Sequence, residues 1–448
     1  MIQFKWVLLC LLAIASQVFA SSKWAKTSEC FNPIVLDATK SLPPSEVEDG
    51  CYFMLMDLQS NLGSKESYYH YAYKLTSENG VQENSELRID YNPAYQQLFL
   101  NSIRICREGK CLDYSKKVKI KELQREDDLN YYIYDETITV YIILEDIRVG
   151  DIVEYSFTRK GSNPVLGNQI YKSFYYQLNY TLLDYHLRII KSKDQFLKIN
   201  TQNCDLQPKR VVSKWGEEFI WQMIDVPAVK VEKYLPQWYS SYVLIEMSSS
   251  KDWGEVREWG VRVFENNEIL NDSLKAICSK ILKSESSEEK RVMAALRYVQ
   301  KNIRYLGIEI GEGSHRPNSP NKVFKQGFGD CKDKSLLLTK MLKEMDVTAY
   351  PALVATIERE HVKSYLPSPT LFNHVITRVD LSNGKSYWVD PTRGNQGGDI
   401  TNNYLSPYGY ALVLNGKGTE LDSVVTSSES HIEIKERFIV NDFEGDAD

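Results

Sequence analysis

Apolar and polar residues alternate in short runs along the first half of the chain. Residues 68–75 and 136–144 show this pattern, and turn-forming sequences such as residues 77–80 separate the runs. Alternation with a period of two and frequent turns is typical of antiparallel β-sandwiches. We therefore expect an N-terminal antiparallel β-sandwich at residues 50–240, behind a lead-in segment of little regular structure at residues 21–49.

The spacing of apolar residues changes in the second half of the chain. Residues 292–303 repeat with the period of an α-helix, and a largely apolar helix is expected directly behind Cys331. Three strand-like runs follow, and Asn-Gly at residues 383–384 joins the last two, which is a strong hairpin signal. Helices followed by an antiparallel sheet predict an α+β domain at residues 248–425, with the Cys331 helix packed on the sheet.

The two ends of the chain predict further segments. Lys5 precedes an apolar run at residues 6–15, and small residues stand near Ala20, so residues 1–20 read as a signal peptide. We therefore expect a secreted or periplasmic protein, with no later run long enough to span a membrane. Alternation resumes after residue 430, which indicates the start of a further β-domain at residues 426–448, cut off where the sequence ends.

Charge argues against a nucleic-acid partner, and the cysteine count predicts an unpaired thiol. The 448 residues carry a net charge of −6 without long blocks of one sign, so a nucleic-acid partner is not indicated. Of eight cysteines, seven remain without the signal peptide, and an odd number leaves one thiol unpaired. Cys106 and Cys111 flank an apparent hairpin tip and are the one local pairing we expect. The remaining connectivity is open, with Cys331 expected to be the unpaired thiol and most others oxidised.

Cys331 occupies a position that favours a reactive thiolate. A helix N-terminus presents unpaired backbone N–H groups that stabilise negative charge. Asp330 is a good N-cap residue, and Gly327 and Gly329 permit the tight turn that leads into the helix. The backbone N–H of Cys331 is in addition a candidate donor for an oxyanion.

A thiolate that transfers acyl groups needs a histidine to move protons, and the chain has six. His374 begins a predicted strand, and Asp390 ends the paired strand across the Asn-Gly turn. Adjacent strands of a hairpin bring these ends together, so the carboxylate can hold the imidazole in one tautomer. We expect a catalytic triad with Cys331 as nucleophile, His374 as base and Asp390 as the orienting group.

Several motifs give the chain a family resemblance. They are Arg304-Tyr305-Leu306-Gly307-Ile308-Glu309, Gly327-Phe328-Gly329-Asp330-Cys331-Lys332-Asp333-Lys334, Tyr350-Pro351-Ala352-Leu353-Val354, Asn373-His374-Val375-Ile376 and Trp388-Val389-Asp390-Pro391-Thr392. Together they resemble the bacterial branch of the transglutaminase-like superfamily, and the preceding region resembles the uncharacterised β-rich domain common before such cores. The resemblance implies a papain-like fold and assigns the same triad. It leaves the oxyanion-stabilising side chain open between Tyr305 and Trp253.

These observations predict a cysteine-dependent acyl transferase or amidase that acts on protein or peptide amides through a thioester at Cys331. Cysteine and histidine spacings for zinc and acidic spacings for calcium are missing from the sequence, so we expect no metal and no cofactor. The alternative is a non-catalytic binding or assembly protein of the cell envelope. In that case the sandwich would bind a partner, and exposed aromatic residues around Tyr175-Tyr176 would form one patch.

Overall fold

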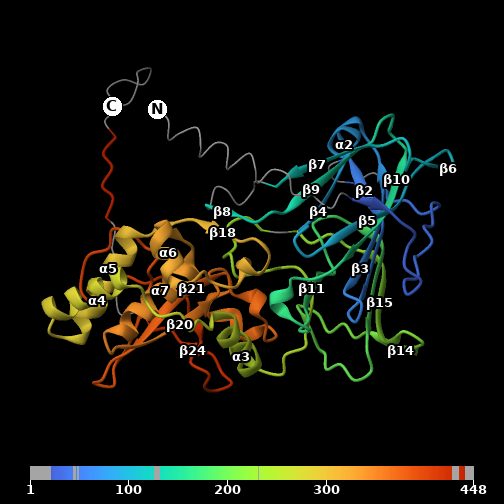
Figure 1. The fold of residues 1–448 in the computed structure, drawn as a ribbon. Coiled ribbons are helices and arrows are strands. Elements are labelled where there is room, and N and C mark those ends of the chain that lie inside the picture. Colours follow the sequence, from blue (N-terminus) through green and yellow to red (C-terminus); the bar gives the residue numbers. More distant parts are fainter. Residues whose placement is uncertain are drawn as a thin grey trace, which may run out of the picture.

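The computed structural model describes residues 22–43, 47, 50–125, 132–230, 232–425 and 433–438. Figure 1 shows a β-rich half, residues 22–248, beside an α+β half, residues 249–425. The predicted signal peptide lies outside the described residues. Of the predicted further β-domain only residues 433–438 are described, and they form neither helix nor strand. No described helix is long and apolar enough to cross a membrane.

The described residues of the β-rich half form a nine-stranded sheet of order β1-β5-β10-β3-β2-β12-β15-β14, with β6 paired to β5. Its strands are β1 (Lys23–Trp24), β2 (Cys51–Asn61), β3 (Glu66–Leu75), β5 (Gln97–Arg107), β6 (Lys110–Asp113), β10 (Ile152–Lys160), β12 (Leu182–Lys191), β14 (Lys209–Ser213) and β15 (Gly216–Val226). β1 runs parallel to β5, and β2 parallel to β12. The prediction of a purely antiparallel sandwich is therefore wrong for this sheet. Alternation shows which face of a strand is buried, but not the direction of its neighbour.

One face of the large sheet packs against two smaller sheets. β4 (Glu86–Tyr91), β9 (Ile138–Ile143) and β7 (Lys119–Gln124) form the first, and β11 (Tyr171–Tyr175), β16 (Leu244–Ser248) and β13 (Lys198–Gln202) form the second. Val140 and Ile142 are fully buried in the first interface, and Ile245 in the second. Tyr69 and Tyr71 of the large sheet contact the apolar residues of both interfaces. The two smaller sheets therefore pack on one shared face of the large sheet.

The lead-in segment covers the opposite face of the large sheet. As expected it has little regular structure, with β1 alone assigned in its described part. Buried polar side chains of the sheet bind its backbone: Gln59 Oε1 accepts from Asn32 N at 3.0 Å, Asp57 Oδ2 accepts from Ile34 N at 3.0 Å, and Arg188 Nη1 donates to the Cys30 carbonyl at 2.6 Å. These bonds fix the part of the segment that follows β1, where the described residues form no strand, because they satisfy buried groups on both partners.

Arg188 makes the strongest of these contacts and gives a test of stability. Its Nε donates to Glu218 Oε2 at 2.7 Å, and both side chains are buried. Arg188→Met leaves the Glu218 carboxylate buried without its partner, so we expect the free energy of unfolding to fall by about 3 kcal/mol in chemical denaturation. Arg88→Met is the control, because its ion pair with Glu86 is exposed. Equal effects of the two changes would contradict this account.

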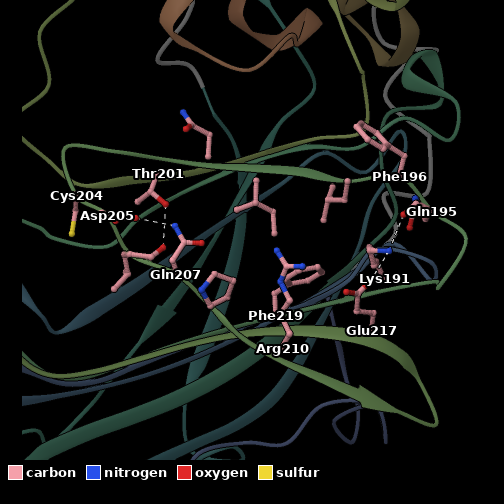
Figure 2. Close-up of a pocket in the computed structure, with 15 residues that line it drawn as sticks. Lys191, Gln195, Phe196, Thr201, Cys204, Asp205, Gln207, Arg210, Glu217 and Phe219 are labelled. Carbon is pink, nitrogen blue, oxygen red and sulfur yellow. Dashed lines mark hydrogen bonds and ion pairs between the residues drawn. The ribbon is translucent and has the colours of Figure 1, made fainter.

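A cavity of about 430 Å³ opens between β13, β14 and β15 at the edge of the β-rich half (Figure 2). Lys191 and Glu217 line it and form an ion pair at 2.9 Å, and Cys204 and Asp205 lie on its opposite side. None of the predicted triad residues lines this cavity. It is therefore separate from the predicted site.

The α+β half consists of helices on an antiparallel sheet of order β22-β21-β20-β23-β24. Its elements are α3 (Trp253–Phe264), α4 (Asp272–Ser284), α5 (Glu288–Asn302), α6 (Pro320–Gln326), α7 (Cys331–Glu344), β20 (Thr348–Val354), β21 (His374–Asp380), β22 (Ser386–Val389), β23 (Tyr410–Val413) and β24 (Asp422–Ser423), and α2 (Glu78–Glu83) lies in the other half. The predicted hairpin between β21 and β22 is confirmed. Gly384 adopts φ 80° in its turn, where a residue with a side chain would be strained.

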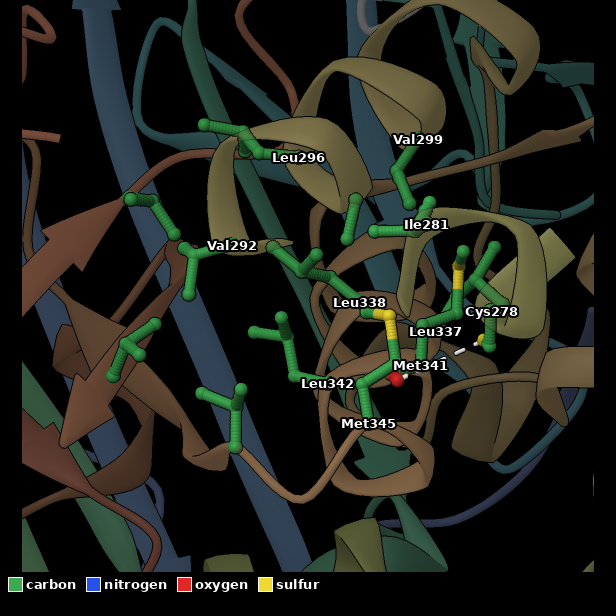
Figure 3. Close-up of a cluster of buried hydrophobic side chains, with 14 of the residues drawn as sticks. Cys278, Ile281, Val292, Leu296, Val299, Leu337, Leu338, Met341, Leu342 and Met345 are labelled. Carbon is green, nitrogen blue, oxygen red and sulfur yellow. Dashed lines mark hydrogen bonds between the residues drawn. The ribbon is translucent and has the colours of Figure 1, made fainter. Parts of the chain in front are cut away.

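Helix α7 is buried on most sides, as its apolar sequence predicts. Leu337, Leu338 and Leu342 have no exposed surface and pack among apolar residues of α4 and α5 (Figure 3). On its other side, Ser335 Oγ donates to the Val375 carbonyl of β21 at 3.0 Å. Contacts on both sides fix the position and rotation of α7, and therefore the direction of the residue at its N-terminus.

The two halves meet through short strands and single hydrogen bonds. β8 (Ile133–Tyr134) pairs in parallel with β18 (Gly307–Ile308), as Figure 1 shows. Trp259 Nε1 donates to the Val165 carbonyl at 2.9 Å, and Asn163 Nδ2 donates to the Gly311 carbonyl at 3.0 Å. The halves are therefore in direct contact, and the contact includes backbone pairing.

The segment between β15 and β16 predicts a protease-sensitive site. The sequence suggests cleavage between Val231 and Ser250, but β16 within this window is buried between β11 and β13. Residues 232–240 have no helix or strand, and Tyr234 is 99% exposed. We expect trypsin to cut first after Lys233 and the two fragments to co-elute in gel filtration, because β16 still pairs with strands of the β-rich half.

Lys233→Gln provides the control for this experiment. It should remove the tryptic cut and leave chymotryptic cleavage after Tyr234 unchanged. A first cut outside residues 232–240, or fragments that separate under native conditions, would contradict the described arrangement.

Candidate active site

Cys331 is the first residue of α7, and the turn before it has the predicted form. Asp330 Oδ1 accepts from Lys332 N at 3.0 Å and from Asp333 N at 3.2 Å. In return, Asp333 Oδ2 accepts from Asp330 N at 3.4 Å. This reciprocal capping box confirms Asp330 as the N-cap. Gly327 ends α6 with φ 75°, a left-handed conformation that glycine adopts without strain.

A buried ion cluster adjoins the cysteine. Lys332 Nζ lies 2.5 Å from Asp330 Oδ2 and 2.9 Å from Glu309 Oε1. Burial disfavours the charged amine, but the two carboxylates raise the pKa of Lys332 above its usual value. No role for Lys332 or Glu309 is evident from the sequence alone, although both stand in the quoted motifs. Their pairing joins β18 to the start of α7, which the spacing of the motifs along the chain does not show.

His374 begins β21, and Asp390 directly follows β22, so the hairpin brings them together. His374 Nε2 donates to Asp390 Oδ2 at 3.0 Å. Burial opposes the imidazolium, but the charge of Asp390 and its hydrogen bond, together with the Cys331 side chain, raise the pKa of His374 to about 10. The structure thus brings all three predicted residues together. Cys331 is 8% exposed, and the His374 side chain is 14% exposed.

Further contacts hold Asp390 in its ionised form. Its Oδ1 accepts from Thr392 N at 2.8 Å and Thr392 Oγ1 at 2.6 Å, and its Oδ2 accepts from the Tyr408 hydroxyl at 3.2 Å. Burial alone would raise the pKa of Asp390, but His374 and Thr392 lower it to about 2. Thr392 belongs to a quoted motif. Tyr408 comes from a later segment, and no sequence pattern indicated its contact with Asp390.

Tyr305 and Trp253, the two candidates for an oxyanion donor, both lie in the apolar cluster that contains Cys331. Tyr305 pairs with Gly329 across β17 (Arg304–Tyr305) and β19 (Phe328–Gly329), two residues before the cysteine. Burial and the nearby Cys331 and Asp330 raise the pKa of the Tyr305 hydroxyl, which therefore stays protonated and able to donate. Trp253 packs against Phe372 at 5.6 Å between ring centroids.

The cysteines differ in part from expectation. Cys106 and Cys111 form a disulfide across the β5–β6 hairpin, and Cys331 is a free thiol, as predicted. Cys30, Cys204 and Cys278 are also free, so at most three of the six other cysteines after residue 20 are oxidised, and the prediction that most of them are oxidised is wrong. Burial of Cys278 in the helical cluster shows why: an apolar environment can account for a thiol without a partner. Among the described residues, no group of His, Cys, Asp or Glu could hold a metal ion.

The fold and this arrangement define a transglutaminase-like core behind a β-rich domain, and comparison with known families agrees. Residues 275–390 match the transglutaminase-like superfamily, and residues 61–230 match a domain of unknown function, DUF3857. The chain therefore contains a transglutaminase-like core at residues 275–390, preceded by a DUF3857 domain at residues 61–230. No curated protein matches it.

Comparison with solved structures identifies a similar fold. A crystal structure from Parabacteroides distasonis ATCC 8503, described as a candidate protease, has a TM-score of 0.66 at 12% identity and covers 85% of this chain and 73% of its own. A candidate cysteine protease from Cytophaga hutchinsonii has 10% identity, covers 50% and 76%, and has a TM-score of 0.24. The periplasmic domain of TgpA from Pseudomonas aeruginosa has 13% identity, covers 65% and 89%, and has a TM-score of 0.23. The first likeness supports the fold, and the other two carry no argument.

The pKa of His374 can be measured directly. We expect its imidazole to lose its proton near pH 10 in histidine-labelled NMR spectra, with His374→Gln identifying the signal. Asp390→Asn removes the carboxylate that raises this pKa, so the imidazole should titrate at lower pH. Asp194→Asn, an exposed change in the β-rich half, should leave the titration unchanged. Titration of His374 near pH 6.5 in the unchanged protein would contradict the described contacts.

Proposed function

We propose that the protein is a cysteine-dependent enzyme that attacks amide bonds of proteins or peptides and forms a thioester at Cys331. The observation that carries this proposal is the meeting of a capped helix N-terminus bearing Cys331 with the His374–Asp390 pair. In this proposal Cys331 is the nucleophile, His374 transfers protons, and Asp390 orients the imidazole. The transglutaminase-like fold supports it, because residues 275–390, which carry all three, match that superfamily.

The chemistry follows from the two nitrogens of His374. Because Nε2 is bound to Asp390, Nδ1 is left to exchange protons with the thiol and the substrate. The Cys331 sulfur adds to the amide carbonyl carbon, and the carbon–nitrogen bond breaks as His374 protonates the leaving amine. An acceptor amine or water then gives a proton to His374 and attacks the thioester, which releases the Cys331 thiolate. The backbone N–H of Cys331, with Tyr305 or Trp253, would bind the oxyanion.

We further propose that the enzyme works outside the cytoplasm. The Cys106–Cys111 disulfide supports this location, because disulfides persist in oxidising compartments. The predicted signal peptide at residues 1–20 agrees with it. Division into a lead-in segment at 21–49, a β-rich domain at 50–240 and a catalytic domain at 248–425 is part of the same proposal.

The alternative of a non-catalytic binding protein rested on an aromatic patch around residues 175–176. Tyr175 is 49% exposed and contacts Tyr242, but Tyr176 is buried and packs against Tyr185 at 5.2 Å between ring centroids. The two side chains therefore lie on opposite sides of the strand end, and this pair gives no support to the alternative.

Reactivity at Cys331 tests the proposal without knowledge of the substrate. We expect iodoacetamide at pH 6 to modify Cys331 at least about tenfold faster than exposed Cys204, because a neighbouring imidazolium stabilises the thiolate. His374→Ala should slow modification of Cys331 and leave Cys204 unchanged, as measured by peptide mapping. If His374→Ala has no effect on Cys331, the two residues are not partners, and His361 or His315 would be tested next.

Turnover distinguishes transfer from hydrolysis. Incorporation of a fluorescent primary amine into casein reports transfer, and release of casein peptides reports hydrolysis. Asp390→Asn should keep the fold and lower either rate by about 10³-fold or more, since the imidazole loses its acceptor. Activity that survives Cys331→Ala would contradict the proposal.

A further inference from the structure

A second cavity, of about 670 Å³, lies where the two halves meet. Tyr69 of β3, Arg159 of β10 and Lys172 of β11 line it from the β-rich half, and Ser314 and His315 line it from the α+β half. Its size falls within the range of small-molecule sites, about 300–1,000 Å³. None of the triad residues lines this cavity, so it is not part of the proposed catalytic site.

Three cations line this junction cavity, and no described lining residue is an aspartate or glutamate. Lys65 Nζ donates to the Gly167 carbonyl at 2.9 Å, and Lys172 Nζ donates to Ser67 Oγ at 3.0 Å. The Arg159 guanidinium lies over the Tyr69 ring, 4.5 Å from its centroid. All of these partners are uncharged, so the positive charge is not neutralised within the described structure.

Three buried cations elsewhere in the chain pair with carboxylates instead, although buried Lys334 donates to the Ile303 carbonyl. Arg188 pairs with Glu218, Lys332 with Asp330 and Glu309, and Lys191 of the cavity in Figure 2 with Glu217. Burying a charge is costly unless an opposite charge or several hydrogen bonds compensate it. The junction cavity is lined by half-buried Arg159 and Lys172 and exposed Lys65, and none of its described lining residues is a carboxylate, so its potential is positive.

Nearby groups respond to this potential. Burial opposes ionisation of Tyr69, but Arg159 and Lys172 lower the pKa of its hydroxyl below the ordinary value. Burial and Arg159 also lower the pKa of Lys172. The lowered pKa of Tyr69 has the direction that the two cations produce, whereas burial is the largest cause of the lowered pKa of Lys172.

Unused hydrogen-bonding groups point to a ligand as well. Arg159 Nε is buried and has no hydrogen-bond partner among the described residues, and the same holds for Gln169 Oε1 and Gln195 Oε1. Buried polar groups in folded proteins are rarely left unsatisfied. Side-chain amides such as those of Gln169 and Gln195 can turn to donate to an oxyanion, and the guanidinium binds carboxylate or phosphate through paired N–H groups.

We propose that the junction cavity binds the oxyanion group, a carboxylate or a phosphate, of a small anionic ligand held between Arg159 and Lys172. This site goes beyond the proposed amide chemistry and does not depend on it. The junction cavity borders the apolar cluster that contains Cys331, because His315 at the edge of the cavity packs on Trp259, a member of that cluster.

Calorimetric titration of the purified protein at low ionic strength tests this site. The probes are sodium triphosphate for the phosphate source and tri-glutamate for the carboxylate source, with tri-glutamine as the neutral comparison. We expect saturable binding of at least one anion and none of tri-glutamine. Lys172→Met and Arg159→Gln should each weaken binding at least about tenfold, because each removes a charge-assisted contact.

Two further variants separate this effect from loss of fold or of overall charge. Lys198→Met removes an exposed cation outside the cavity and should leave affinity unchanged. Asn168→Asp adds a carboxylate at the exposed edge and should weaken anion binding without disturbing the packed interior. Absence of saturable binding of both anions, or equal affinity in Lys172→Met and Lys198→Met, would overturn the proposal.

Discussion

The burial of helix α7 between α4, α5 and the antiparallel sheet is the constraint on which the rest of the α+β half depends. Leu337 and Leu338 face the helices, and Ser335 binds the β21 backbone one residue beyond His374. A packed interior has few alternative arrangements, so this contact sets the distance between the helix N-terminus and the start of β21. The capping box then completes the turn that carries Cys331.

Charged side chains have different kinds of partner in different parts of the molecule. At the candidate active site the His374–Asp390 pair and the Lys332 cluster each combine opposite charges, although buried Lys334 donates to the Ile303 carbonyl. In the junction cavity the cations have only neutral partners. Charges paired with opposite charges hold side chains in place, whereas charges without such partners attract a ligand. This difference distinguishes the candidate active site from the junction cavity.

The order of elements along the chain does not follow the division into halves. β16 comes after the exposed segment at residues 232–240, yet it pairs with β11 and β13 of the β-rich half. Its last residue, Ser248, donates from Oγ to the Pro367 carbonyl of the α+β half at 2.6 Å. This strand thus belongs to a sheet of the β-rich half and also contacts the α+β half, which helps to keep the two halves in a defined contact.

The sequence by itself determined the local elements: the capped helix at Cys331, the β21–β22 hairpin, the Cys106–Cys111 pair and the alternating strands. Each depends on residues close together in the chain, whose spacing and capping chemistry are visible without a structure. Only the tertiary structure decided the parallel pairing of β2 with β12, the contacts of Tyr408 and Glu309 at the site, and the absence of carboxylates in the junction cavity. These features join residues far apart in the chain, and periodicity records which face is buried but not which distant residue covers it.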